Sequence, residues 1–455
     1  MNSVTRLACA AEATRWEEIP IMVRDQATDL FCDTLAVISA GLAHPTYAPF
    51  VDAHSSTLGK ASVPGLTEGV PALTAALING GATTVLQLQD GHRLARGHPA
   101  SHLVPALLSV AEEKRASCDQ MMEAFVSGYE VGTRIGIALG GMNAALHDTG
   151  TWSTIATAVG VTHLLTGGNR EAIAAAIEEA AAVSPMPYRE TAAGGASVHH
   201  LYVGLGTTTG IIVANAVVAG LSPLSGTLDA FFGPRAGAAY ESEKLTQGID
   251  STDHWTDYEL MNAYIKTHPT CAHLHGVNDA VASLIADHAL SGDDIARVDI
   301  ALYGAALEFE NPVPKNDLSA RFSVAATVAI ALHYGELTIS SLTNETLNAP
   351  EVKDLMKRVY VSHDPQLDSQ YPEGRPSRVS IACHDGRELT LSVIYPLGDC
   401  TNPLGREARR SKARDLLTHR FGQLGAGEVL RAWDVVIEGG PVSSLSQVLR
   451  EPAVN

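Results

Sequence analysis

The first two-thirds of the chain is dominated by long, small-residue apolar stretches that predict helices. No clear alternation of apolar and polar residues occurs before about residue 290. Early prolines and following glycines mark helix starts and ends. The predicted helices are residues 19–42, 99–115, 151–166, 170–183 and 206–219. In the first of them, Asp25, Asp29 and Asp33 recur every four residues, which places three acids on one helix face.

The pattern changes after about residue 290. Residues 295–302 alternate and predict a strand, and 358–362 are a second candidate. Residues 378–383 and 388–395 flank an Asp-Gly pair, which predicts a hairpin. A helix is predicted over 320–334, and the chain from about 405 onward is helical and charged. We therefore expect a mainly α fold with an inserted α+β domain. A large all-helical domain is formed by both chain ends (1–269 and 400–455), and a smaller α+β lid domain spans 270–399.

Composition and charge narrow the function classes. A chain of 455 residues with 45% apolar and 18% charged residues is long enough for two globular domains. Its formal net charge of −19 argues against general nucleic-acid or anionic-membrane binding. We see no apolar run of about 18 residues and no long apolar leader, so we expect neither a membrane-spanning helix nor a signal peptide. The six cysteines are scattered without a C-x-x-C pair, which favours a cytoplasmic location.

Histidine-rich segments are the candidates for chemistry. The segment 87–101 places Asp90, His92, Arg93, Arg96 and His98 just ahead of a predicted helix start. Free N–H groups at a helix start favour anions, so a carboxylate site is one interpretation. A solvated polar loop is the other.

Two further segments carry histidines next to helices. His147 and Asp148 open a polar turn in which Asp148 or Thr149 is also an ordinary helix cap. A second segment begins with His199 and His200 and continues into a G-x-G-x-x-x-G run. A dinucleotide fingerprint needs a different glycine spacing and a preceding strand. Close helix packing is therefore the better account of these glycines.

The segment KTHPTCAHLH lies at the predicted domain boundary. A metal site of His268, His273 and His275 lacks a carboxylate partner, and a Cys271 nucleophile has no other support. The interpretation we favour has Lys266 and a histidine transferring protons and binding anions in a cleft between domains. A polar connector without chemistry is the remaining alternative.

These segments, in this order, resemble the MmgE/PrpD family. That family carries an L-D-x-D-D-T segment followed by His-Pro, a His-x-Thr-Gly turn, a Lys-x-x-x-x-Gly segment, a Lys-x-Tyr-Pro-x-Cys…His segment, an Ala-Arg-Phe-Ser motif and a P-x-G-x-x-x-N-P segment. The corresponding residues here are 86–91 with 98–99, 147–150, 199–204, 266–275, 320–323 and 396–403.

The resemblance implies a helical domain with an α+β lid, a homodimer, no metal or organic cofactor, and small polycarboxylate substrates. Family members include 2-methylcitrate dehydratase, cis-aconitate decarboxylase and iminodisuccinate epimerase. Two acidic positions of the family are Gln87 and Gln89 here, and the usual Lys is His199. These departures lie in segments that the resemblance places at the active site. They favour an iminodisuccinate epimerase, with a lyase acting on a tricarboxylic acid as the alternative.

Epimerisation without a cofactor needs a base and a conjugate acid on opposite sides of the α-carbon, with cations holding the carboxylates. We predict Lys266 paired with His98 or His147 for this role. A silent ligand-binding relative and a metal-dependent hydrolase remain further alternatives. The predicted substrate-binding residues are Asp90, Arg93, Arg96, His199, His200, Tyr202, His273, His275 and Arg321.

Overall fold

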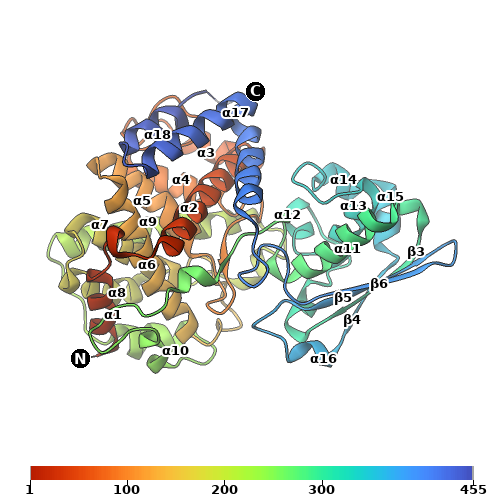
Figure 1. Cartoon of the computed structure of the whole chain (residues 1–455), viewed down its shortest axis with the longest axis horizontal. Coiled ribbons are helices and arrows are strands. Elements are labelled where there is room, and N and C mark those ends of the chain that lie inside the picture. The colour runs from red at the N-terminus through yellow and green to blue at the C-terminus, as the bar shows by residue number, and fades with distance from the viewer. Residues whose placement is uncertain (1, 453–455) are drawn as a thin grey trace.

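The computed structural model describes residues 2–452 and shows two lobes of unequal size (Figure 1). The larger lobe is helical and combines segments from before and after the smaller one. Its helices are α1 (Ser3–Glu12), α2 (Ile21–Leu42), α3 (Ala48–His54), α4 (Ala72–Ala82), α5 (Pro99–Lys114), α6 (Cys118–Ala138), α7 (Trp152–Thr166), α8 (Arg170–Val183), α9 (Leu201–Val218), α10 (Gly233–Ala236), α17 (Arg406–Ile437) and α18 (Val442–Leu449).

The smaller lobe, which we call the lid, carries a four-stranded sheet. Its helices are α11 (His275–His288), α12 (Asp317–Ala320), α13 (Val324–Tyr334), α14 (Asn344–Asn348), α15 (Pro350–Met356) and α16 (Pro365–Asp368), and its strands are β3 (Ile295–Leu302), β4 (Val359–His363), β5 (Ser377–Cys383) and β6 (Glu388–Val393). The strand order is β4-β3-β5-β6, with β3 parallel to β4 and antiparallel to β5. The predicted fold class, a mainly α protein with an α+β insertion, is confirmed.

The acidic face of α2 is the surface on which α17 packs. Arg409 lies 3.3 Å from Asp29, and Lys412 lies 2.8 Å from Asp33. Beneath these ion pairs, the rings of Phe31 and Trp433 stack with their centroids 5.0 Å apart. Residues from the two ends of the described chain therefore share one core.

Small residues let α9 approach its neighbours closely. A Cβ on Gly204 would lie 2.5 Å from the carbonyl oxygen of Leu77 in α4, and one on Gly206 would lie 2.7 Å from Thr154 Oγ1 in α7. The packing role predicted for these glycines is therefore confirmed. Among residues 2–452, one helical stretch, 197–218, is long and apolar enough to cross a membrane, with a mean hydropathy of 1.6. However, 56% of the 18-residue window with that hydropathy is buried in this fold, and a core helix passes the same test.

Several local predictions need correction. The helix predicted over 206–219 begins earlier, at Leu201, because it continues directly from a 3-10 turn over Ser197–His200 in which His199 and His200 are buried. A two-residue strand pair, β1 (Gly91–His92) and β2 (Ala263–Tyr264), exists before residue 290, where none was expected. The helix predicted over 320–334 is interrupted, because Ser323 caps a new helix through its side chain.

Candidate active site

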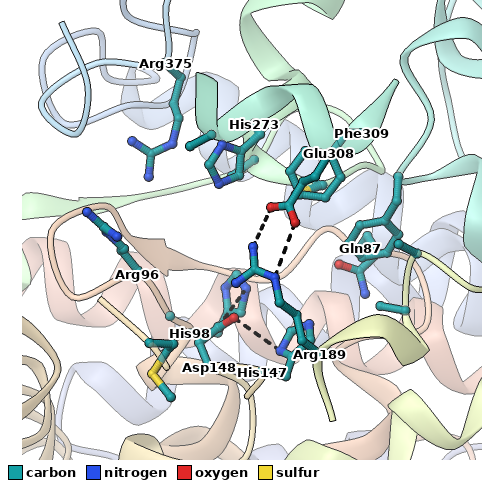
Figure 2. A pocket seen from close by; sticks show the side chains of 18 of the residues that line it. Gln87, Arg96, His98, His147, Asp148, Arg189, His273, Glu308, Phe309 and Arg375 are labelled. Carbon is teal, nitrogen blue, oxygen red and sulfur yellow. Dashed lines mark hydrogen bonds and ion pairs between the residues drawn. The ribbon is translucent and has the colours of Figure 1, made fainter. Parts of the chain in front are cut away.

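A cavity of about 220 Å³ lies between the large lobe and the lid (Figure 2). That volume is below the roughly 300–1,000 Å³ of sites for drug-sized ligands, so the site suits a small molecule. Four Lys or Arg side chains and three carboxylates line it, together with small and aromatic apolar residues. The lining residues used below are Gln87, Arg96, His98, His147, Asp148, Arg189, Lys266, His273, Glu308, Tyr371 and Arg375.

The short β1–β2 pair places Lys266 in this cavity. Gly91 pairs with Tyr264 and His92 pairs with Ala263. Lys266 follows Tyr264 by two residues and so lies next to the segment that carries His98. Lys266 is 1% exposed, and its ammonium donates to the carbonyl oxygen of Gln87 over 3.1 Å. Burial lowers the pKa of Lys266 to about 8. Its amine therefore changes protonation close to neutral pH.

His98, Asp148 and His147 form a chain along the large-lobe wall. Asp148 Oδ2 lies 3.8 Å from His98 Nε2, and its Oδ1 lies 3.2 Å from His147 Nδ1 (Figure 2). Burial, followed by the Lys266 cation, lowers the pKa of His98 to about 4. Burial alone would raise the pKa of Asp148, but the contact with His147 outweighs it and holds that pKa below its usual range. The site therefore holds a carboxylate between two imidazoles, one of them neutral.

Hydrogen bonds fix the orientation of these groups. The His98 Nδ1–H donates to the carbonyl oxygen of Asp90, which leaves Nε2 of the neutral ring without a proton. His102, which the sequence analysis did not single out, links the start of α5 to the turn after Asp148. Its Nδ1 bonds the carbonyl oxygen of His98 at 2.9 Å, and its Nε2 accepts from Gly150 N–H at 3.1 Å.

Cations from both lobes surround the aromatic ring of Tyr371. The guanidinium carbon of Arg96 lies 5.2 Å from the ring centroid, and that of Arg375 lies 5.1 Å from it. Arg375 also donates to the carbonyl oxygens of Pro372 and Gly374. His273 bonds the Tyr303 hydroxyl at 2.5 Å, and burial holds its pKa well below the usual range. The lid wall therefore offers one positive charge and one neutral imidazole.

Gln87 and His199 form a neutral pair beside this chain. Gln87 has a left-handed backbone (φ +54°), and its side-chain amide donates to His199 Nε2 over 3.2 Å. The proton of the His199 ring is consequently on Nδ1, which is buried without a partner. Burial holds the pKa of His199 well below its usual range. The His199 and His147 ring centroids are 4.9 Å apart.

Asp90 does not line the cavity, and it changes the predicted anion site. Its carboxylate accepts from the N–H groups of Ala100 and Ser101, each at 3.0 Å, and from the Ser101 hydroxyl at 2.7 Å. Burial raises its pKa to about 6. A carboxylate of this chain thus occupies the helix start that the sequence analysis offered to a substrate.

Five other predicted binding residues are absent from the cavity lining besides Asp90 and His199. Arg321 is fully buried and donates to the carbonyl oxygens of Leu86 and Pro269. The remaining four also have partners within the fold: Arg93 pairs with Asp399 at 2.8 Å, His200 packs on Tyr47, Tyr202 donates to the carbonyl oxygen of Tyr188, and His275 packs on His268. These contacts join residues far apart in the chain or depend on the path of a loop, so sequence spacing does not reveal them.

The cavity also contains residues that the sequence analysis missed, chiefly Arg189, Glu308 and Arg375. Each lies in a loop or short turn, so no helical or strand periodicity marks it. For Arg189, the signal available in the sequence was its place in the segment Pro187-Tyr188-Arg189, in the loop before a small-residue helix. No group of three or more His, Cys, Asp or Glu within residues 2–452 is arranged to hold a metal ion. The arrangement can bind several carboxylates and exchange a proton through Lys266.

Comparisons with known proteins give a consistent family. The family model of the MmgE/PrpD N-terminal domain matches residues 5–237, and that of the MmgE/PrpD C-terminal domain matches residues 268–434. A cis-aconitate decarboxylase of Aspergillus terreus is 24% identical over 454 residues, covering 91% of this chain and 90% of the relative. The cis-aconitate decarboxylases of Homo sapiens and Mus musculus are 26% and 25% identical, each covering 76% of this chain and 72% of the relative.

Proposed function

This chain belongs to the MmgE/PrpD family, and from that premise we propose that it is a cofactor-independent lyase that decarboxylates a small tricarboxylic acid. The observation that carries the proposal is the cavity between the lobes. It combines four Lys or Arg side chains with a lysine whose pKa is about 8. The relatives named above support a lyase, and they give no support to the preference for iminodisuccinate epimerase drawn from the sequence.

The positively charged side chains of the cavity complement the negative charge of a tricarboxylate. Arg96 and Arg189 come from the large lobe and Arg375 comes from the lid, and the Lys266 ammonium donates to the carbonyl oxygen of Gln87. Buried cations in a site with little water stabilise negative charge where it develops during a reaction. The −19 charge of the whole chain does not prevent this, because the local field in a cleft determines binding there.

The proposed step breaks the bond between carbon and one carboxylate. Carbon dioxide leaves, and the electron pair stays on the carbon skeleton as a carbanion whose negative charge is stabilised by the cations that hold the remaining carboxylates. The Lys266 ammonium then transfers one proton to carbon, giving an unsaturated dicarboxylate when the substrate is unsaturated. Solvent reprotonates Lys266. A pKa near the working pH suits a group that must both give and regain a proton. Asp148 would hold the two histidines beside the reacting carbon.

The test is incubation of the purified protein with cis-aconitate and 2-methylcitrate in D₂O. Decarboxylation predicts carbon dioxide release and one deuterium incorporated into the product, both visible by NMR. Dehydration would instead give a product that absorbs in the ultraviolet without carbon dioxide release. If the folded protein catalyses neither of these reactions, the lyase assignment is contradicted.

Epimerisation of iminodisuccinate is the second candidate, because Gln87 and His199 make a neutral pair where other family members carry charged residues. Lys266 with His98 or His147 would then remove and return the α-proton. Incubation of one stereoisomer in D₂O decides this point. Deuterium at the α-carbon together with loss of optical purity supports the epimerase, and retention of both proton and optical purity excludes it.

A further inference from the structure

Arg189 and Glu308 face one another across the cavity from different lobes. Arg189 lies in the loop between α8 and α9, and Glu308 lies in the 3-10 turn Gly304–Phe309 that follows β3. Arg189 Nε donates to Glu308 Oε2 over 3.3 Å, and its Nη2 donates to Oε1, so both carboxylate oxygens are held (Figure 2). The two side chains are 37% and 38% exposed, so a ligand entering from solvent reaches them.

The loop that carries Arg189 is attached to the histidine chain. Arg189 N–H donates to the carbonyl oxygen of Ala145 over 3.1 Å, and His147 N–H donates to that of Pro187 over 2.9 Å. Leu146 and Tyr188 form an antiparallel bridge between these contacts. The ion pair consequently links the lid to the segment that holds His147 and Asp148.

We propose that Glu308 occupies on Arg189 the position of a substrate carboxylate, and that the bound substrate displaces it. This inference rests on the proposed polycarboxylate function. A guanidinium fork donates two hydrogen bonds to any carboxylate in the same geometry, whether that carboxylate belongs to the chain or to a ligand. Glu308 is therefore a resident competitor at the mouth of the site.

The competitor makes Arg189 selective for ligands already held deeper in the cavity. A ligand anchored on Lys266 and Arg96 presents its remaining carboxylate to Arg189 at a high effective concentration, whereas a free carboxylate does not. A tricarboxylate that binds inside the cavity through two carboxylates has a third carboxylate left for Arg189. A four-carbon dicarboxylate whose two carboxylates are both bound inside has none left for Arg189. Glu308 thus makes the site favour ligands with three carboxylates over ligands with two.

The test measures binding of tricarballylate and succinate by calorimetry, without turnover. Glu308→Gln removes the competing charge, and we expect the Kd for tricarballylate to fall about five- to tenfold, with the Kd for succinate unchanged. Arg189→Gln should raise the Kd for tricarballylate. The double variant should match Arg189→Gln alone, because a competitor without its partner has no effect.

A matched control is Asp299→Asn. It breaks another exposed ion pair of the lid, in which Asp299 lies 2.6 Å from Arg297 on β3, away from the cavity. Both dissociation constants should stay unchanged. Unchanged or weaker tricarballylate binding by Glu308→Gln would overturn the proposed competition. Binding without turnover of any tricarboxylate would overturn only the lyase assignment. No binding by either the parent or Glu308→Gln would overturn both.

Discussion

The environment of Lys266 sets the expected pH dependence of the reaction. Its pKa of about 8 in the folded protein is below the usual lysine value of 10.5 because the ammonium is buried. Since the ammonium is the proposed proton donor, kcat should fall about tenfold per pH unit above pH 8. A pH–rate profile between pH 6 and 10 measures this. An activity that rises through pH 8 would assign Lys266 as a base instead.

Unfolding linked to Lys266 cannot produce that loss of activity. A lysine with a lowered folded-state pKa destabilises the folded protein while it is protonated, below about pH 8. That cost disappears as the pH rises from about 8 to 10.5. The contribution of Lys266 to stability therefore increases over the range in which the rate should fall. Thermal unfolding measured at the same pH values provides the control.

Replacing Lys266 by Met tests its role directly. Met keeps much of the buried volume and removes the proton donor, so kcat should fall about 10²–10⁴-fold while the protein stays folded. Steady-state kinetics and circular dichroism together measure both properties. Full activity in a folded Lys266→Met protein would remove this residue from the chemistry.

Asp148 is expected to act through the two histidines that it contacts. Asp148→Asn keeps the shape but removes the charge beside His98 and His147, so kcat should fall about 10²-fold with little change in KM. The kcat and KM values separate this from loss of binding. A rise in KM alone would instead make Asp148 a binding residue.

At the residue scale, sequence motifs identified the segments but not which side chain enters the cavity. Lys266, His98 and His147 do line it, as do Arg96 and His273. Arg321 and Asp90 carry the right chemistry, yet backbone groups of the chain use their hydrogen-bonding capacity. Arg189 and Arg375 enter the site from loops whose paths depend on tertiary packing, and no local pattern records those paths.

At the scale of the elements, glycines determine how closely α4 and α9 of the large lobe approach each other. The two helices meet through Gly80 and Gly204, whose backbones leave no room for a side chain. Gly204→Ala should therefore destabilise the protein by about 1–3 kcal/mol through overpacking. Chemical denaturation measures the change.

Gly427→Ala is the matched control for that substitution. Gly427 lies within α17, and the nearest atom to an added Cβ is the flexible Arg431 guanidinium at 3.3 Å. Because Ala is a better helix former, this variant should gain about 0.5–1 kcal/mol. Equal effects of the two substitutions would contradict the packing argument.

Long apolar segments and the Asp-Gly hairpin were predictable from sequence, because their patterns are local. Residues 170–183 and 295–302 match α8 and β3. The β1–β2 pair was not predictable, since two residues per strand leave no pattern and only tertiary contact joins them. This small pair nevertheless positions Lys266. The elements most important for the site are thus the least visible in sequence.

At the scale of the whole molecule, the cavity walls come from both lobes, so a bound polycarboxylate should stabilise the two together. Tricarballylate at about 100 times its Kd should add about 2.7 kcal/mol to the free energy of unfolding. Hydrogen exchange should slow in residues 184–200 of the large lobe and 304–309 of the lid. The hairpin turn at 384–387 provides a reference that should not change. Protection confined to one lobe would contradict binding between them.

The homodimer and the cytoplasmic location suggested by the sequence stay predictions, because a single chain tests neither. The two-lobe arrangement itself follows from the sequence pattern, since the strands cluster in one stretch between helical segments. The relative placement of the lobes does not follow from it. That placement involves tertiary contacts between residues far apart in sequence, such as Arg93 with Asp399 and Arg321 with the carbonyl oxygen of Leu86.

The shared core of α2 and α17 has a consequence for synthesis on the ribosome. Phe31 emerges early, but its stacking partner Trp433 is made some 400 residues later. At typical rates of about 5–20 residues per second, the apolar side of α2 waits tens of seconds for its cover. The lid, whose strands and helices are neighbours in sequence, has all its parts before α17 is translated. The nascent large lobe is therefore the part that needs protection by chaperones. A chain that ends before residue 406 should be prone to aggregation.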